Sequence, residues 1–338
     1  MLNIAINGFG RIGRQAFKIA LTKKNLRVAA INELGDIKNM AYLLKYDSVY
    51  GRYPKSVKAD GANLIVAGKK FPVYACANPA ELPWKKLGVD AVLECTGVFT
   101  KKEDAEKHLE AGAKAVIISA PSKSEGVTTV VRSVNEEKAV GQKIVANASC
   151  TTNCCAPVMA VLAKKFGVEK ALLSTVHAMT ASQRIVDSPN TKDWREGRAA
   201  SANIIPSSTG AAIATALVLP ELKNKFDGVS FRVPVVCGSV VDIVALLKKN
   251  VTPQSVNDAF KKASQEKRFS GVLETTEEDL VSSDILGTTA SAIVDLRYTR
   301  VVGGNLVKIV VWYDNEWAYA NRLVEMVEFV ISAKGGQA

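Results

Sequence analysis

The sequence predicts an α/β fold of two domains: an N-terminal doubly wound domain with a parallel sheet, and an α+β domain with a mixed, largely antiparallel sheet. Three observations lead to this prediction. The chain has 338 residues, which at roughly 150 residues per domain suggests two domains. Its opening reads strand, turn, helix, strand, and parallel strands joined in this way have helices on both faces of their sheet. Beyond residue 170 longer apolar runs follow one another, which favours an antiparallel or mixed sheet.

The first domain is expected to span residues 1–149. Residues 2–6 form a short apolar run suited to a buried strand, and apolar side chains then recur at helical spacing from Ile12 to Ala20. Residues 26–31 read as the second strand. Later strands are predicted from similar short runs at 63–67, 71–75, 91–95, 115–119 and 143–146, with a charged helical stretch at 101–111.

The second domain is expected to span residues 150–314. It begins with a helical pattern over 150–166 and continues with strand-like runs at 171–178, 228–236, 239–247, 290–296 and 306–313. A polar, Arg-rich loop at 179–203 follows the first of these runs. A loop of this length inside a compact domain is usually functional or part of an interface. Residues 315–333 read as a closing amphipathic helix.

The composition excludes several classes of protein. Apolar residues make up 48% of the chain and charged residues 23%, which excludes a disordered, collagen-like or coiled-coil chain. No apolar run approaches the ~20 residues that span a bilayer, and the first residues lack a signal-peptide pattern, so we expect a cytoplasmic protein with no membrane partner. The net charge of +11 favours anionic ligands, but the basic residues are dispersed, so nucleic acid is not expected as a primary partner.

Cysteines and histidines are few. Six cysteines in a chain of this length do not make a disulfide scaffold, and they fit a reducing compartment. With only His108 and His177 available, and without paired C-x-x-C spacing, the sequence does not match a structural zinc site. We therefore expect no metal.

The turn at residues 8–13 carries the first chemical signal. Gly8, Gly10 and Gly13 have the spacing G-x-G-x-x-G between a predicted strand and a predicted helix. Such glycines allow a tight turn, let a pyrophosphate approach the backbone, and bring helix and strand close together. Glu33 ends the next strand about 20 residues later, where a carboxylate binds ribose hydroxyls and repels a 2′-phosphate. The first domain is therefore predicted to be Rossmann-type and to bind NAD in preference to NADP.

Cys150 and His177 are the candidate nucleophile and base. Cys150 opens the helix at 150–166, and the positive end of a helix dipole can lower a thiol pKa from ~8.5 to roughly 3.5–7.5. Such a cysteine can equally be a small buried hydrophobic residue, and the residues alone leave both interpretations open. His177 ends a strand and is the candidate imidazole base, with a hydrogen-bonded structural histidine as the alternative. His108 lies in the charged stretch at 101–111 and is predicted to be a solvated surface residue.

Groups that could hold a phosphoester occur later in the chain. They are the hydroxyl of Thr180, the segment 207–210 ahead of a further helix, and the guanidinium of Arg232. Hydroxyls, helix N-termini and guanidiniums bind phosphate oxygens, although each taken singly is more often a cap or a surface group.

Several of these residues fall within longer motifs that occur in order along the chain. The motifs lie at 7–14, 43–48, 148–154, 175–180, 203–210, 232–234 and 312–317. Through these seven motifs the chain resembles the phosphorylating glyceraldehyde-3-phosphate dehydrogenases over essentially its whole length. The run Ala-Ser-Cys-Thr-Thr-Asn-Cys at 148–154 is a highly specific element of the resemblance.

The resemblance implies an NAD-dependent aldehyde oxidoreductase of glycolysis. Its reaction converts D-glyceraldehyde 3-phosphate, NAD and inorganic phosphate into 1,3-bisphosphoglycerate. Cys150 matches the family's nucleophile, which forms a hemithioacetal and then a thioester, and His177 matches the base that assists it.

The resemblance also implies binding residues and a quaternary structure. Thr180 and Arg232 match contacts to the C3 phosphate of the substrate. The site for inorganic phosphate corresponds to Ser149, Thr151, Thr209 and Gly210. Cofactor contacts other than the glycines and Glu33 correspond to Arg11, Ile12, Ser119 and Asn315. The resemblance further implies a homotetramer in which the loop at 179–203 reaches across subunits, and a C-terminal helix at 315–333 that packs back onto the first domain.

Two alternatives stay open. Erythrose-4-phosphate dehydrogenases share the Cys–His pair and a glutamate like Glu33, but they tend to lose the threonines that correspond to Thr180 and Thr209, which are present here. An RNA-binding or surface-associated protein is the second alternative, and it is motivated by the charge of +11. That alternative requires a contiguous basic face, whereas the lysines are dispersed along the chain.

Overall fold

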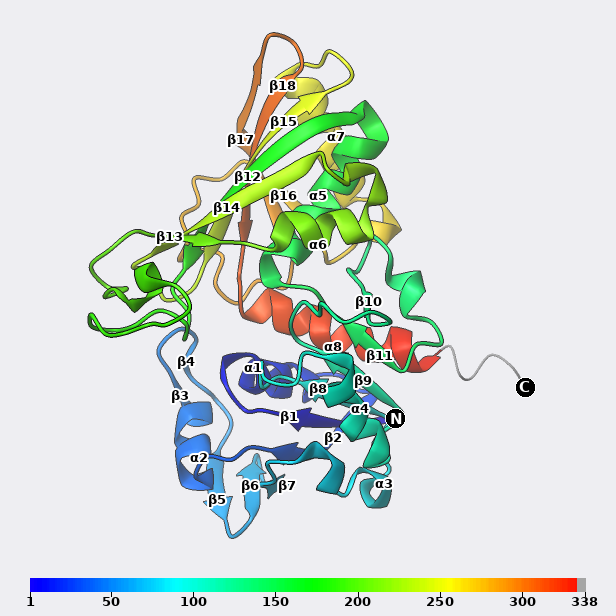
Figure 1. Ribbon diagram of the computed structural model, residues 1–338, viewed down its shortest axis with the longest axis vertical. Helices are drawn as coiled ribbons and strands as arrows, with labels where there is room; N and C mark the ends of the chain where they lie inside the picture. The colour runs from blue at the N-terminus through cyan, green and yellow to red at the C-terminus, as the bar shows by residue number, and fades with distance from the viewer. Residues whose placement is uncertain (333–338) are drawn as a thin grey trace. The chain divides into compact units, whose positions relative to one another are not determined.

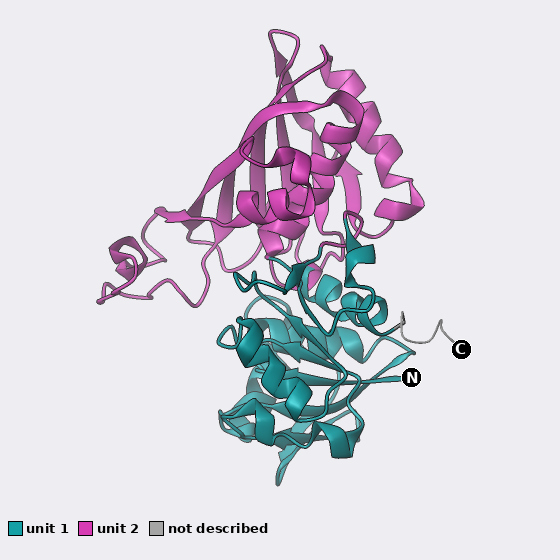
Figure 2. Cartoon of the chain, turned by 45° about the vertical axis from the view of Figure 1, so that its right-hand side comes forward, with its two compact units in different colours: residues 1–130, 135–148, 319–338 teal, residues 131–134, 149–318 magenta. Residues whose placement is uncertain are grey.

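The structure, a computed structural model, describes residues 1–332, which form two compact units (Figure 2). Unit 1 comprises residues 1–130, 135–148 and the described residues from 319 on, and unit 2 comprises residues 131–134 and 149–318. Residue 333, predicted to end the last helix, lies outside the described residues. The described helix, α8 (Trp317–Ser332), joins unit 1 from Tyr319 on.

Unit 1 is built on a nine-stranded sheet with the order β10-β11-β9-β8-β1-β2-β7-β6-β5 (Figure 1). The strands are β1 (Leu2–Asn7), β2 (Leu26–Asn32), β5 (Val57–Asp60), β6 (Asn63–Val66), β7 (Lys69–Tyr74), β8 (Ala91–Glu94), β9 (Ala115–Ile118), β10 (Thr128–Thr129) and β11 (Ile144–Ala146). A separate ribbon pairs β3 (Tyr46–Asp47) with β4 (Gly51–Arg52). The helices are α1 (Arg11–Ala20), α2 (Ile37–Lys45), α3 (Trp84–Leu87), α4 (Lys102–Glu110) and most of α8, with 3₁₀ turns η1 (Pro79–Glu81) and η2 (Glu136–Ala139).

The order of the strands in unit 1 reverses at β1. Neighbouring strands from β10 to β7 pair in parallel, and β6 and β5 add to the edge in antiparallel fashion. The strands β8 and β9 are buried along their whole length, as expected for parallel strands covered on both faces. Because β1 lies between β8 and β2, the carboxyl ends of these three strands form the switch point at which doubly wound sheets bind ligands.

Unit 2 is built on a seven-stranded sheet with the order β13-β14-β12-β15-β18-β17-β16. The strands are β12 (Val168–Ala178), β13 (Ile205–Ser208), β14 (Phe226–Val233), β15 (Ser239–Leu247), β16 (Leu273–Thr276), β17 (Ala292–Val302) and β18 (Leu306–Tyr313). The helices are α5 (Cys150–Phe166), α6 (Ala211–Val218) and α7 (Pro253–Ser264), with 3₁₀ turns η3 (Trp194–Gly197), η4 (Pro220–Leu222) and η5 (Lys267–Phe269). Only β12–β14 and β16–β17 pair in parallel, so this sheet is mixed and largely antiparallel.

These two architectures confirm the predicted fold class. Some elements differ from their predictions. The run predicted at 290–296 is longer as β17, which continues past a register shift between Asp295 and Arg300. The helix α7 was not predicted, although Thr252 makes a capping box with Ser255 and Pro253 occupies its first turn.

Candidate active site

The dinucleotide-binding turn of unit 1 lies between β1 and α1. Gly8 has a φ of +89°, and a Cβ on it would lie 2.7 Å from the backbone nitrogen of Thr96. A Cβ on Gly13 would lie 2.1 Å from the carbonyl oxygen of Gly8, whereas one on Gly10 would meet nothing within 4 Å. Gly10 is the N-cap of α1 and has no side chain that could accept from the first-turn N–H groups. This open face at a helix N-terminus fits the pyrophosphate of NAD.

Glu33 lies directly after β2 and beside the same turn. Its Oε2 accepts a hydrogen bond from the N–H of Phe9 at 2.7 Å, and its Oε1 accepts one from the N–H of Gly35 at 3.1 Å. An ionised carboxylate has about four acceptor sites, so Glu33 can also accept from ribose hydroxyls. Its place at the end of β2 is where the acidic residue of a dinucleotide site is expected.

Three further residues predicted to contact the cofactor also belong to unit 1. Arg11 and Ile12 begin α1, and Nη1 of Arg11 donates to Oδ1 of Asp47 at 2.9 Å. Ser119 follows β9, and its backbone N–H donates to the carbonyl oxygen of Glu94 at 2.9 Å. Arg11 and Ile12 thus lie at the start of α1, and Ser119 lies at the carboxyl end of β9.

Cys150 and His177 meet in unit 2. Cys150 is the first residue of α5, whose N-cap Ser149 accepts from the N–H of Thr152 at 3.1 Å and so fixes the first turn. His177 lies near the end of β12 and is 4% exposed. The Sγ of Cys150 lies 3.4 Å from Nε2 of His177. The candidate nucleophile and the candidate base are therefore in direct contact.

The pairing of β12 with β14 brings Arg232 to the same place. The two strands are parallel, and His177 stands opposite Arg232 in their register. Nη1 of Arg232 lies 2.6 Å from Nδ1 of His177 and 3.3 Å from the carbonyl oxygen of Ala178. Nδ1 of His177 itself lies 2.6 Å from that oxygen. The structure therefore brings together three of the predicted residues, Cys150, His177 and Arg232.

Burial dominates the electrostatics of this group. Burial and the charge of Arg232 lower the pKa of His177 to about 4, so its imidazole is neutral at pH 7. Burial raises the pKa of Cys150, although Arg232 and hydrogen bonds from Thr151 oppose that rise. The helix dipole can lower a thiol pKa, but in this structure desolvation of the thiolate has the larger effect. The resting pair is a thiol beside a neutral imidazole.

Tyr313 is a member of this site that the sequence did not single out. Its hydroxyl lies 2.9 Å from Oγ1 of Thr151 and 2.9 Å from Oγ1 of Thr175. Its ring packs edge-on against that of His177, with centroids 5.9 Å apart. Burial raises the pKa of Tyr313, so the phenol stays neutral. The sequence could have indicated its burial, because Tyr313 is two residues after Val311 in an alternating strand and therefore lies on the same buried face.

The remaining predicted phosphate ligands make local hydrogen bonds. Thr180 is exposed, and its N–H and hydroxyl donate to Oε1 of Gln183 at 2.9 and 3.1 Å. Thr209 accepts from the N–H of Ala211 at 3.2 Å, and Gly210 is the N-cap of α6. These residues occupy the start of the loop at 179–203 and the start of a helix, which are positions suited to anions.

Asn315 is anchored within unit 2. Its Oδ1 accepts from the N–H of Gly238 at 3.1 Å and from the hydroxyl of Ser239 at 2.9 Å. The oxygen of Ser239 in turn accepts from the N–H of Ala178, the neighbour of His177, at 3.1 Å. With its oxygen engaged in this way, Asn315 has its amide NH₂ as the donor end of the side chain.

His108 is not the solvated surface residue that the sequence predicted. It is 0% exposed on α4, where it contacts Trp84 and Glu94. The prediction was wrong because Lys and Glu residues occupy the outer face of α4, whereas Ala105 and His108 share its buried face three residues apart.

All six cysteines are free thiols. Within residues 1–332, His, Cys, Asp and Glu side chains form no group of three that could hold a metal ion. Over the same residues, none of the helices has the length and apolar character needed to cross a membrane.

The two sites define a class of protein. A doubly wound unit with a dinucleotide-binding turn, in one chain with a cysteine in contact with a buried histidine, is characteristic of an NAD-dependent oxidoreductase. The sequence model for the NAD binding domain of glyceraldehyde 3-phosphate dehydrogenase matches residues 2–102, and that for its C-terminal domain matches residues 149–315. The chain belongs to the glyceraldehyde-3-phosphate dehydrogenase family, and NAD is its cofactor.

Curated relatives agree with these matches over nearly the full chain. The glyceraldehyde-3-phosphate dehydrogenase of Streptomyces coelicolor is 51% identical, covering 97% of this chain and 98% of the relative. That of Geobacillus stearothermophilus is 50% identical over 98% of each chain. Glyceraldehyde-3-phosphate dehydrogenase 1 of Kluyveromyces marxianus is 50% identical, covering 98% of this chain and 100% of the relative.

Proposed function

We propose that the protein converts D-glyceraldehyde 3-phosphate, NAD and inorganic phosphate into 1,3-bisphosphoglycerate and NADH, as a step of glycolysis. The observation that carries this proposal is the 3.4 Å separation between Sγ of Cys150 and Nε2 of His177 at the start of α5. The motifs that surround both residues, and the activity for which the relatives are named, support the substrate.

Cys150 forms the covalent intermediates in this proposal. Its Sγ attacks the aldehyde carbon while the thiol proton passes to Nε2 of His177 and on to the carbonyl oxygen, which gives a hemithioacetal. His177 then takes the hydroxyl proton as the carbon loses a hydride, and a thioester remains. NAD, when bound, supplies the hydride acceptor. An oxygen of inorganic phosphate attacks the thioester carbon, the C–S bond breaks, and the sulfur recovers a proton from His177.

The neutral state of His177 suits this role. To accept a proton at Nε2, the ring must carry its own proton on Nδ1, where the carbonyl oxygen of Ala178 lies 2.6 Å away as acceptor. Nη1 of Arg232, which can only donate, lies 2.6 Å from Nδ1 and 3.3 Å from the same oxygen, so in this arrangement it competes with a proton on Nδ1. A substrate phosphate would give the guanidinium a stronger, charged acceptor and leave the Ala178 oxygen to the imidazole.

The anionic groups of the reactants would bind to two sets of residues. Arg232 and Thr180 would hold the C3 phosphate of the aldehyde through a guanidinium and a hydroxyl. Inorganic phosphate would be held by hydroxyls and helix N-terminal groups of Ser149, Thr151, Thr209 and Gly210. NAD would be held by Gly8, Gly10, Arg11, Ile12, Gly13, Glu33, Ser119 and Asn315.

We assign the cofactor domain to residues 1–149 with the C-terminal helix, and the catalytic domain to residues 150–314.

A kinetic assay of NADH formation tests the proposal. We expect a rate with glyceraldehyde 3-phosphate that depends on inorganic phosphate and is higher with NAD than with NADP. Faster oxidation of erythrose 4-phosphate without phosphate dependence would instead support the erythrose-4-phosphate dehydrogenase alternative. Turnover with neither substrate, together with RNA binding of steep salt dependence, would favour the RNA-binding alternative.

We also infer that the protein is a cytoplasmic homotetramer. The face of the unit 2 sheet away from α5 exposes apolar side chains, among them Leu172 at 64% and Leu306 at 39%. The loop at 179–203 exposes Ile185 at 85% and Trp194 at 86%. Exposed apolar groups of this kind are typical of protein–protein interfaces. Light scattering on the purified protein tests the assembly, and a monomer at micromolar concentration would contradict it. The free cysteines fit a reducing compartment.

A further inference from the structure

A buried carboxylate lies at the switch point of the unit 1 sheet. Glu94 ends β8 and is 1% exposed. Its Oε2 accepts from Nδ2 of Asn7 at 2.5 Å and lies 3.1 Å from Nε2 of His108. Its Oε1 accepts from the N–H of Thr96 at 2.8 Å and from the Thr96 hydroxyl. Hydrogen-bonding groups thus surround both oxygens, as burial of a carboxylate requires.

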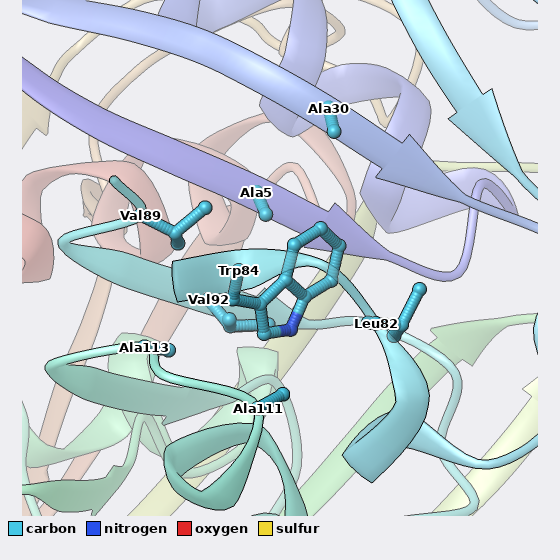
Figure 3. Packing of buried hydrophobic residues seen from close by; sticks show 8 residues of the cluster. All are labelled: Ala5, Ala30, Leu82, Trp84, Val89, Val92, Ala111 and Ala113. Carbon is cyan, nitrogen blue, oxygen red and sulfur yellow. The ribbon is translucent and has the colours of Figure 1, made fainter. Parts of the chain in front are cut away.

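Trp84 fixes the protonation state of His108. An indole N–H can only donate, so Nδ1 of His108, 3.0 Å from Nε1 of Trp84, must accept. The proton of the neutral ring is therefore on Nε2, from which it is donated to Glu94. The indole has no room to turn away, because it is 0% exposed and packs with small apolar side chains (Figure 3). These are Ala5, Ala30, Leu82, Val89, Val92, Ala111 and Ala113.

The other groups on the carboxylate border the dinucleotide-binding turn. Oδ1 of Asn7 accepts from Nδ2 of Asn32 at 2.7 Å, and the N–H of Gly8 donates to the carbonyl oxygen of Asn32 at 2.8 Å. A Cβ on Gly8 would lie 2.7 Å from the backbone nitrogen of Thr96. Gly8 is therefore enclosed by Asn7, Asn32 and Thr96, and Glu94 holds two of these three residues.

We propose that His108 is a positioning residue for cofactor binding, which acts through Glu94 to hold Asn7 and Thr96 in the arrangement that receives NAD at Gly8. Of the two side chains that contact Oε2 of Glu94, His108 and Asn7, only Asn7 remains as a donor when the Nε2–H of His108 is removed. A buried carboxylate oxygen that loses a donor costs free energy, so we expect Glu94 to move towards another donor. Any such movement shifts Asn7 and Thr96, and with them the walls of the turn. The inference rests on NAD binding by unit 1 and adds a residue that need not touch the cofactor.

The test compares NAD affinity with stability in matched variants of the full chain. His108→Leu removes both hydrogen-bonding nitrogens, whereas His108→Gln keeps one donor and one acceptor. Val116→Ala is the control, because Val116 is 0% exposed on β9, contacts the buried face of α4 through Ala105, and has no polar group. Calorimetric titration with NAD gives the dissociation constant, and thermal unfolding without NAD gives the stability.

We expect His108→Leu to weaken NAD binding about tenfold, and His108→Gln to stay within about threefold of the unsubstituted protein. Val116→Ala is expected to lower the unfolding temperature without changing NAD affinity. At saturating NAD, kcat of His108→Leu should stay within about twofold, so the effect appears in KM for NAD. Unchanged NAD affinity in His108→Leu, or an equal loss in Val116→Ala, would overturn the proposal. If the unsubstituted protein fails to bind NAD, the cofactor assignment itself is at fault.

A milder variant covers the case in which His108→Leu does not fold. Trp84→Phe keeps an aromatic ring in the apolar pocket and removes only the N–H that fixes Nδ1 as an acceptor. Nδ1 of His108 then loses its donor, so the ring is held less firmly in the orientation that presents Nε2–H to Glu94. We expect a two- to fivefold loss of NAD affinity, and no loss would contradict a role for the Trp84–His108–Glu94 chain.

Discussion

The two histidines of this protein are both buried and both hydrogen-bonded, yet they differ in what their ring nitrogens contact. The nitrogens of His108 contact Trp84 and Glu94, which are themselves buried and have no reactive proton to exchange. The Nε2 of His177 contacts the thiol of Cys150. Its Nδ1 lies near both Arg232 and a backbone oxygen.

This difference separates a histidine that holds structure from one that can move a proton. The tautomer of His108 is fixed by a donor-only indole on one side and a carboxylate on the other. His177 has a pKa lowered to about 4 by burial and by Arg232, and its neighbour at Nε2 is a group that can give up a proton. Burial and hydrogen bonding therefore do not by themselves mark a catalytic histidine, whereas the chemistry of the partner does.

The largest effect is expected from removing the partner of His177. Cys150→Ser should reduce turnover by roughly 10⁴-fold or more, because an alcohol is a far weaker nucleophile than a thiol beside a neutral base. NAD affinity of unit 1 should stay within about twofold. Stopped-flow or steady-state kinetics and calorimetry measure the two quantities. Cys155→Ser is the matched control, since this buried thiol contacts the hydroxyl of Thr215 and a serine can keep that contact. Near-normal turnover in Cys150→Ser would remove Cys150 from its proposed role.

The same substitution at the two histidines should give opposite results. His177→Gln should lower kcat by about 10²- to 10⁴-fold, because an amide cannot accept the thiol proton. His108→Gln should leave kcat within about twofold, because an amide reproduces one donor and one acceptor. Steady-state kinetics at saturating NAD measure both. Equal losses in the two variants would show that the distinction between the two histidines is false.

Removing the guanidinium beside His177 should have an intermediate effect. Arg232→Ala is expected to lower kcat/KM for the phosphorylated aldehyde ten- to a hundredfold, the range for about 1.5–3 kcal/mol of a charged hydrogen bond. KM for NAD should not change. Arg297→Ala is a suitable control, because Arg297 is exposed and pairs with Asp279 at the surface. Unchanged kcat/KM in Arg232→Ala would contradict a phosphate-binding role.

The smallest effect on turnover is expected where a buried charge serves stability, as with Asp47 of unit 1. Burial raises the pKa of Asp47, but the N–H of Val49 and the guanidinium of Arg11 lower it by more, to about 2. Because the folded-state pKa is below the unfolded one, this carboxylate stabilises the fold at neutral pH. That contribution is lost as the pH falls from about 4 to about 2. Asp47→Asn should cost about 2 kcal/mol of unfolding free energy at pH 7.

Urea unfolding at pH 7 and at pH 3 checks this expectation. The difference in unfolding free energy between Asp47→Asn and the unsubstituted protein should shrink at pH 3. At that pH the carboxyl group of Asp47 is mostly protonated in the unfolded chain, which stabilises the unfolded state relative to the folded one. An equal difference at both pH values would mean that the charge of Asp47 contributes nothing.

Local patterns explain which parts of the structure could be predicted. The turn at Gly8–Gly13 depends on residues adjacent in the chain, so its spacing shows in the sequence. The strands of both sheets were largely predicted because their apolar runs reflect burial directly. Short elements with mixed faces, such as β5 and β16, carry too few apolar residues to be distinguished from loops.

Features that depend on tertiary register could not be predicted from the residues alone. The contact between His177 and Arg232 requires that β12 and β14 pair in parallel in one particular register. The hydroxyl of Tyr313 meets Thr151 and Thr175, from which it is separated by 162 and 138 residues in sequence. The motif resemblance supplied Cys150, His177 and Arg232 as candidates, whereas Tyr313 had no such role attached. The roles of all these residues stay predictions until the variants are measured.

The discontinuous make-up of unit 1 has a consequence for synthesis on the ribosome. Several apolar side chains of α8 are fully buried, among them Leu323, Val324, Val327 and Val330. This helix belongs to unit 1 but follows the whole of unit 2 in the chain. Nascent chains tend to fold domain by domain from the N-terminus, but here the first unit to emerge lacks a core helix until the second has been translated. Unit 2 can therefore acquire its complete set of contacts before unit 1 does, although it is made later.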